Sequence, residues 1–381
     1  MTRVARFATI RLFAHIDWTL LASVVAISLL GIATMHSFST TDAFFERQII
    51  WLSLSVAVFF TTSLSSYHFL RRTPVITALY VGIGTLLALI FLFGAIVKGA
   101  QQRFDLGLFF VQPSDPAKLV LIALLAKYFA RRHIEIRHIR HILLSGAYAL
   151  TIFALVFLQP DFGSGIIIFA IWLGMVLVAG ISWKHLALFF LVAALLGAGA
   201  WQYGLQDYQK DRIFSFLNPL ADIQGAGYNA YQSTIAVGSG EVWGKGVGYG
   251  TQSKLQFLPE YQTDFIFAAY AEEWGFVGVA ILLTLFCIVI FRILMVASHA
   301  TDNFDTLLAA GVAVYFFAQF IVHVGMNMGL LPITGTTLPF MSYGGSHLLT
   351  EYAALGLLMG LRKGASASRR VRSGTEIVGA L

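Results

Sequence analysis

Charged residues are scarce in this chain. Of its 381 residues only 12% are Asp, Glu, Lys or Arg, whereas 58% are hydrophobic and the mean hydropathy is +0.77. Because soluble domains carry about 25% charged residues, this composition excludes a water-soluble globular protein and indicates a membrane protein. Cysteine is also nearly absent. The single Cys287 excludes an intrachain disulfide.

Long apolar runs recur along almost the whole sequence. A helix needs roughly 20 apolar residues to cross a hydrocarbon core of about 30 Å, and the runs are of that length. The sequence therefore predicts an all-α, polytopic integral membrane protein with about ten transmembrane helices. We expect them at roughly 17–37, 47–66, 75–97, 112–130, 142–158, 163–181, 184–204, 264–292, 306–330 and 347–362.

The distribution of Lys and Arg predicts the orientation, because short loops rich in these residues stay in the cytoplasm. Most of the 25 Lys and Arg residues fall on one set of loops, near 3–11, 71–72, 127–140, 184, 292 and 362–372. Both termini are therefore expected inside. Orientation also accounts for the net charge of +6, so no nucleic-acid partner is inferred.

The predicted helices divide the chain into one transmembrane domain, residues 1–362, and a basic cytoplasmic tail, 363–381, that we expect to be disordered. The loops are short except for one of roughly residues 205–263, between the seventh and eighth helices. Long loops inside compact proteins are usually functional. By the orientation above, this loop is extracytoplasmic.

Two polar motifs lie at outer helix ends. In the first, Ser114 is a candidate N-cap, Pro116 is tolerated in the first turn, and Asp115 and Lys118 share a helix face and can pair. A salt bridge that pins the helix end and a wall of a binding site are both open interpretations. In the second motif Asp161 is placed to cap the next helix, which explains it about as well as function does.

Polar residues also interrupt two apolar helices. Gln319, His323 and Asn327 fall four apart on one helix and form a polar stripe, which more often serves packing than function. The adjacent Glu272 and Glu273 must find donors or protonate inside a membrane helix, and we expect them to organise structure.

The densest polar cluster runs from Pro259 to Gly275, where the long loop becomes a membrane helix. Asp264 is expected in the first turn of that helix, at the outer surface. A carboxylate at this junction can act as a base.

The order of the motifs resembles the SEDS family. The resemblance is carried by Asn218-Pro219, Gly227-Tyr228-Asn229, Gly238-Ser239-Gly240, Gly250-Thr251-Gln252-Ser253-Lys254, Pro259-Glu260, Thr263-Asp264-Phe265 and the run from Gly329 to Ser346, with Gln112-Pro113-Ser114 and Gln159-Pro160-Asp161 extending it over most of the chain. Gly244-Lys245-Gly246 and the motif ending at Lys254 are more similar to the elongation branch (RodA-like) than to the division branch (FtsW-like).

The resemblance implies a peptidoglycan glycosyltransferase of the bacterial cytoplasmic membrane that polymerises lipid II during cell elongation, together with a class B penicillin-binding protein and other elongation-machinery proteins. It also implies that Asp264 is the catalytic carboxylate. Two positions depart from the family pattern: Phe104 stands where the family usually has Trp, and Asp115 where it usually has Glu.

The implied reaction displaces a lipid pyrophosphate by a sugar hydroxyl with inversion, so it needs one general base and positive charge near the leaving group rather than a carboxylate pair. We expect Asp264 to be the base and Arg47, Arg103, Lys118 and Lys245 to bind pyrophosphate or peptide carboxylates. The motifs add Asp115, Glu260 and Ser342 as substrate-binding residues. No metal-ligand spacing is found, so no cofactor is assigned, although a divalent cation (Mg or Mn) is an alternative carrier of the charge.

Two other functions fit a protein of this class. A lipid flippase or transporter would place its polar and helix-breaking groups near the bilayer midplane, whereas the strongest motifs here gather at outer helix ends. A non-catalytic scaffold of the wall-synthesis machinery would not need its outer carboxylates.

Overall fold

A computed structural model describes residues 15–38, 43–65, 67–97, 100–105, 107, 110–131, 139–203, 210, 214, 216 and 227–378. Its elements in chain order are α2 (Trp18–Phe38), α3 (Ala43–Leu64), the 3-10 helix η1 (Tyr67–Arg71), α4 (Thr73–Phe93), β1 (Ala95–Val97), β2 (Ala100–Asp105), β3 (Phe110–Val111), α5 (Ser114–Ala130), α6 (Ile139–Phe157), α7 (Phe162–Ala179), α8 (Trp183–Tyr203), α10 (Tyr228–Ser239), α11 (Thr251–Lys254), α12 (Ile266–Ser298), α13 (Asn303–Asn327) and α14 (Gly345–Val378).

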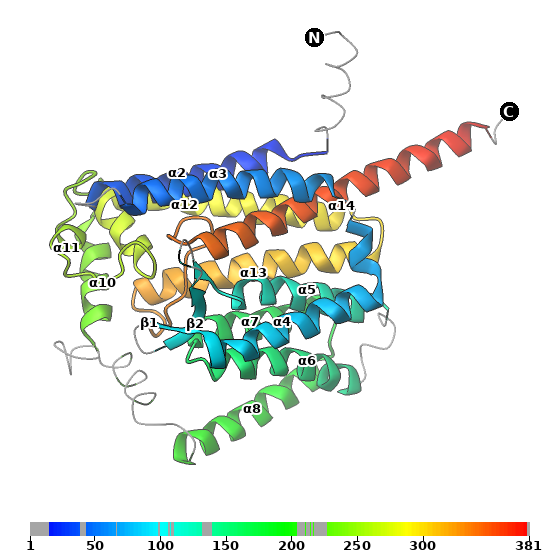
Figure 1. Ribbon diagram of the computed structural model, residues 1–381, viewed down its shortest axis with the longest axis horizontal. Coiled ribbons are helices and arrows are strands. Elements are labelled where there is room, and N and C mark those ends of the chain that lie inside the picture. Colours follow the sequence, from blue (N-terminus) through cyan, green and yellow to red (C-terminus); the bar gives the residue numbers. More distant parts are fainter. Residues whose placement is uncertain are drawn as a thin grey trace, which may run out of the picture.

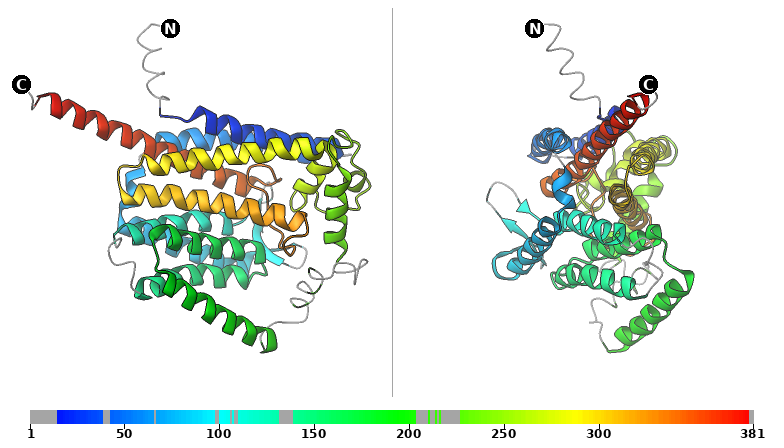
Figure 2. Two further views of the ribbon diagram at one scale, coloured as in Figure 1. Left: turned by 180° about the vertical axis from the view of Figure 1, so that it is seen from behind. Right: turned by 90° about the vertical axis from the view of Figure 1, so that its right-hand side faces the viewer.

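The long helices form a bundle of roughly parallel and antiparallel rods (Figure 1). Helix α13 lies inside it and packs against α5, α7 and α12, while α14 packs against α3, and α2 joins α3 to α12. Helix α8 lies at the rim of the bundle, as the end-on view in Figure 2 shows. The polar site described below is therefore held by the enclosed helices and not by α8.

Eight of the described helices are long and apolar enough to cross a membrane: α2, α3, α4, α6, α7, α8, α12 and α13. Their outward faces carry large apolar side chains, such as Leu92 on α4 and Leu195 on α8, which are 73% and 66% exposed. In water such a large exposed apolar surface would promote aggregation, but it is the surface expected for helices that face lipid. The all-α membrane fold is confirmed, and the number of ten spans stays a prediction.

Glycines let the helices of the bundle approach each other closely, as is common where lipid replaces water. A Cβ atom on Gly356 of α14 would lie 2.5 Å from the backbone oxygen of Phe59 on α3. A Cβ atom on Gly311 of α13 would lie 2.6 Å from the side chain of Ile122 on α5. The contacts of α14 with α3 and of α13 with α5 therefore depend on these two positions having no side chain.

The two ends of the bundle differ in their polar groups. We call the end that carries β1–β3, α10 and α11 the outer end, because the distribution of Lys and Arg assigns it to the outside (Figure 1). At the opposite, inner end, buried Asp17 accepts hydrogen bonds from Arg292 Nε at 2.8 Å and Arg362 Nη1 at 3.2 Å. Its other oxygen accepts from Leu20 N–H at 3.1 Å. One carboxylate thus joins α2, α12 and α14.

We expect Asp17→Asn to lower the stability of the protein in detergent by about 1–3 kcal/mol, because hydrogen bonds to charged groups contribute on that order and both arginines would lose a charged partner. A lower melting temperature of the purified variant checks this. The exposed Glu46 on α3 provides the control, since Glu46→Gln removes a carboxylate that is not buried. Equal melting temperatures for Asp17→Asn and wild type would contradict the prediction.

Three short strands follow α4 where only helix and loop were predicted. Helix α4 ends at Phe93, with Gly94 in an extended conformation, rather than at Val97. Strand β2 pairs antiparallel with both β1 and β3. The apolar run continues past the end of the helix as β-branched Ile96 and Val97, so hydrophobicity alone could not locate the change from helix to strand.

Two further predictions at helix ends were wrong. Helix α14 continues to Val378, whereas the last helix was expected to end near residue 362; the segment beyond contains no proline, and its Ala, Lys and Arg residues favour helix. Ser114 is not the N-cap of α5. Helix α5 begins at Ser114 after Pro113, and no side chain caps it.

Candidate active site

Asp264 lies in a tight turn that enters α12, two residues before the helix begins and not in its first turn. The backbone N–H groups of Thr263 and Phe265 both donate to the carbonyl of Glu260, at 3.0 and 3.3 Å. Burial raises the pKa of the nearby Tyr261 phenol, so that group stays protonated and does not compete as a base. The half-buried Asp264 is therefore presented on a closed turn and not on a loose loop.

The end of α13 and the loop that follows it hold this turn in place. The side-chain amide of buried Asn327 donates to the carbonyl of Asp264 at 3.0 Å, and its oxygen accepts from Ala268 N–H at 3.2 Å. Ser342 Oγ donates to the carbonyl of Thr263 at 2.8 Å. One residue of the polar stripe predicted on α13 therefore supports the site, because Asn327 fixes the backbone of Asp264.

The loop between α13 and α14 connects Asp264 with the start of α7. A Cβ atom on Gly335, whose φ is +71°, would lie 3.5 Å from Asp264 Oδ2. On its other side the loop touches α7, because a Cβ atom on Gly163 would lie 2.8 Å from the carbonyl of Thr334 and 2.6 Å from the Thr336 methyl group. Only the short loop segment Thr334–Thr336 therefore lies between Asp264 and the start of α7.

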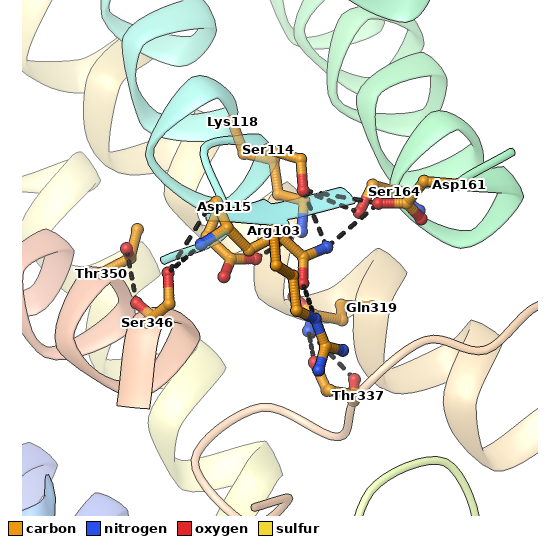
Figure 3. Close-up of polar contacts among 11 residues, drawn as sticks. Arg103, Ser114, Asp115, Lys118, Asp161, Ser164, Gln319, Thr337, Ser346 and Thr350 are labelled. Carbon is orange, nitrogen blue, oxygen red and sulfur yellow. Dashed lines mark hydrogen bonds and ion pairs between the residues drawn. The ribbon is translucent and has the colours of Figure 1, made fainter. Parts of the chain in front are cut away.

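Those helix starts form a connected network (Figure 3). Asp161 caps α7 as predicted, accepting from Ser164 N–H at 3.0 Å. Its other oxygen accepts from the Gln112 amide at 3.1 Å and from the Ser114 hydroxyl at 3.4 Å. Arg103 of β2 donates to the Gln112 side chain at 3.2 Å, which leaves the exposed Arg103 on the open side of the network.

The predicted pair on α5 is present and buried. Lys118 Nζ lies 3.2 Å from Asp115 Oδ1, and the side chains are 5% and 8% exposed. Asp115, Lys118 and Arg103 all act electrostatically on His347 near the start of α14. Three of the predicted site residues therefore lie near one position, that of His347.

The start of α14 joins this charged group to Asp264. Ser342 contacts Thr263, while the hydroxyl of Ser346 accepts from Gln112 N–H at 3.2 Å. Four residues span at most about 14 Å when fully extended. The Asp264 turn, Arg103 of β2 and the start of α5 with Asp115 and Lys118 are thus parts of one site at the outer end.

Other predicted substrate-binding residues lie differently. Ser342 is fully buried, and besides its bond to Thr263 it accepts from Leu338 N–H at 2.8 Å, so its hydroxyl serves the fold of the loop. Lys245 is paired with Glu272 at 2.7 Å. Glu260 belongs to the Asp264 turn, and its carboxylate accepts from Thr263 Oγ1 at 3.3 Å. Arg47 is exposed on α3.

Two buried residues around the site were not predicted from the sequence. Gln48 of α3 donates to the carbonyl of Ser342 at 3.2 Å and accepts from Gly344 N–H at 3.3 Å. Glu351 of α14 accepts from Phe340 N–H at 2.8 Å. Each is a polar residue inside an apolar run, and that signal could have found both.

In the part of the chain that the structure describes, no group of three or more His, Cys, Asp or Glu side chains is arranged to hold a metal ion.

Comparison with known proteins fixes the family. The model of the FtsW/RodA/SpoVE family of cell cycle proteins matches residues 8–367. The chain belongs to this family. The SEDS resemblance of the motifs is thereby confirmed, and this FtsW/RodA/SpoVE protein is a multi-pass protein of the bacterial cytoplasmic membrane.

Individual relatives match this family member along nearly its whole length. Peptidoglycan glycosyltransferase MrdB of Escherichia coli strain K12 is 35% identical over 352 residues, which are 91% of this chain and 93% of that protein. A chain of a solved peptidoglycan synthase complex that coordinates polymerization and crosslinking has a TM-score of 0.80 at 30% identity, over 92% of this chain and 98% of the other. The crystal structure of the rod shape determining protein RodA of Thermus thermophilus has a TM-score of 0.68 at 30% identity, over 91% and 96%.

Proposed function

We propose that this protein is a peptidoglycan glycosyltransferase that polymerises lipid II into glycan strands during cell elongation, with Asp264 as general base. The main support for this activity is the similarity to MrdB over 91% of the chain. The position of Asp264 at the outer end, on a turn fixed by Asn327 and Ser342, supports its role.

The reaction is an inverting displacement. The 4-hydroxyl of one sugar attacks the anomeric carbon of another, the bond from that carbon to the lipid pyrophosphate breaks, and the base takes the hydroxyl proton. Pyrophosphate leaves well without protonation, so one carboxylate is sufficient. Asp264 is an outer carboxylate at a loop-to-helix junction, where a substrate with its tail in the bilayer presents its sugar.

Positive charge near the leaving group supplies the second requirement of the reaction. The exposed Arg103 donates to the side chain of Gln112, and the buried Lys118 is paired with Asp115. These two cations are the best placed to receive the pyrophosphate. Arg47, exposed on α3, fits a contact with the peptide part of the substrate.

The physiological partner is a crosslinking enzyme, a class B penicillin-binding protein. This proposal rests on the structural likeness to a chain of a peptidoglycan synthase complex that coordinates polymerization and crosslinking. Polymerisation and crosslinking would then occur side by side, so that each new strand reaches the transpeptidase as it grows.

The experiment that tests the function is polymer formation by the purified protein. Fluorescent lipid II in liposomes is incubated with the protein alone, with its cognate transpeptidase, and with or without a chelator. We expect glycan strands in the complex, and loss on chelation would assign a divalent cation to the pyrophosphate. Lipid II translocation without chain growth would instead support a flippase, and neither activity would support a scaffold.

A further inference from the structure

Helix α12 is broken at Gly275, ten residues after it leaves the Asp264 turn. Gly275 has φ 62° and ψ −165°, a conformation that only glycine adopts readily. A break inside a membrane helix leaves backbone groups without intrahelical partners, and these groups must be satisfied by other parts of the protein.

The segment Glu241–Gly246 supplies those partners. Below the break, Phe276 N–H donates to the carbonyl of Glu241 at 2.8 Å and Val277 N–H to that of Val242 at 3.1 Å. Above it, the carbonyl of Glu272 accepts from Lys245 N–H at 2.9 Å, and the carbonyl of Glu273 accepts from Gly246 N–H at 3.0 Å. The segment therefore forms backbone hydrogen bonds with the helix on both sides of the break.

The insertion depends on glycines that permit contact between backbones. A Cβ atom on Gly275 would lie 2.2 Å from the nitrogen of Gly244. A Cβ atom on Gly244 would lie 2.1 Å from the carbonyl oxygen of Glu273, and one on Gly240 would lie 2.0 Å from that of Ala271. These distances are far below van der Waals contact, so the fit leaves the short helix above the break little room to move.

An ion pair also joins this segment to the upper part of α12. Lys245 Nζ lies 2.7 Å from the carboxylate of Glu272, which is fully buried and also accepts from the N–H groups of Thr251 at 2.9 Å and Gln252 at 3.1 Å. Glu273 accepts from the hydroxyl of Ser37 on α2. The carboxylates that the sequence placed together thus fasten the upper part of α12 to two different neighbours.

We propose that Lys245 is a positioning residue that acts through Glu272 to hold Asp264 in its reactive place, and that Lys245 does not contact the substrate. The short upper helix begins at Ile266, directly after the Asp264 turn, and Glu272 lies near its other end, about 9 Å from Ile266 by the helical rise of 1.5 Å per residue. A rotation of this helix moves Asp264, and misplacement of a reacting group by about 1 Å can cost about 10²-fold in rate. The inference rests on the proposed function.

The test uses neutral variants of the pair in the full-length protein with its transpeptidase. Lys245→Met leaves the buried Glu272 charge without its ion-pair partner, and we expect about a 10- to 100-fold loss of kcat with the KM for lipid II changed less than about twofold. Glu272→Gln keeps a side-chain oxygen for Thr251 N–H and removes the charge. Added to Lys245→Met, it should restore activity to within a few-fold of wild type.

Two controls accompany the pair. Lys245→Arg keeps the ion pair and should stay near wild type. Lys254→Met removes an exposed lysine of α11 whose ammonium group donates to the carbonyl of Gly248 at 3.4 Å, and should have no effect. Together they separate the loss of this particular pair from the loss of any positive charge on the segment.

The double variant decides the question even where Lys245→Met alone fails to fold. Activity in Lys245→Met/Glu272→Gln shows that no substrate contact is lost with the lysine. A double variant as inactive as Lys245→Met with a raised KM, or full activity in Lys245→Met alone, overturns the inference. If wild type makes no polymer, the proposed function fails instead, so the two failures are distinguishable.

Discussion

Asp264→Asn should abolish polymerisation of lipid II while leaving the protein folded. Asparagine has the size of aspartate, and the bond that Asn327 donates goes to the backbone carbonyl of residue 264, which the substitution leaves in place. What is lost is the carboxylate that we propose takes the proton of the attacking hydroxyl. General-base catalysis contributes about 10²- to 10⁴-fold, so polymer should fall below detection in a standard gel assay of strand length.

The measurement needs a control for charge and a control for folding. Asp105 on β2 is an exposed carboxylate at the same end of the molecule, and Asp105→Asn should leave polymerisation within about twofold of wild type. The Asp264→Asn protein should keep the melting temperature of wild type and still purify with its transpeptidase. Polymer formation by Asp264→Asn at the wild-type rate would remove Asp264 from the mechanism.

The local features of the site could be predicted from the sequence because they depend on residues close together in the chain. Asp115 and Lys118 are three apart on a helix, so their pairing follows from helical geometry alone. Asp161 directly precedes α7, and its capping bond to Ser164 spans three residues. In both cases the partner lies within one helical turn.

The long-range features could not be predicted in this way. The backbone groups left free by the break at Gly275 form hydrogen bonds with Glu241 and Val242, which come more than 30 residues earlier. No local sequence pattern predicts this pairing. For the same reason the ion pair of Lys245 with the buried Glu272, which belongs to another element, could not be predicted. Ser342 was placed in the site by its motif, whereas the structure uses its hydroxyl to hold the Asp264 turn.

Lys118→Met should both destabilise the protein and stop polymerisation, and a second substitution should separate the two effects. Removing Lys118 leaves Asp115 as an unpaired charge that is only 8% exposed. Breaking a buried ion pair in this way costs about 3–5 kcal/mol, which should appear as a much lower melting temperature in detergent. Asp115→Asn combined with Lys118→Met replaces the pair by neutral side chains and should recover most of that stability.

The activity of the double variant distinguishes the two roles that the motif leaves open. A salt bridge that only pins the start of α5 would be dispensable once the neutral pair is stable, and polymerisation would return with the melting temperature. A cation that receives the pyrophosphate cannot be replaced by methionine. Because Lys118 shares its surroundings with Arg103 around His347, we expect a stable but inactive double variant, with its loss mainly in kcat, since charge on the leaving group develops in the transition state.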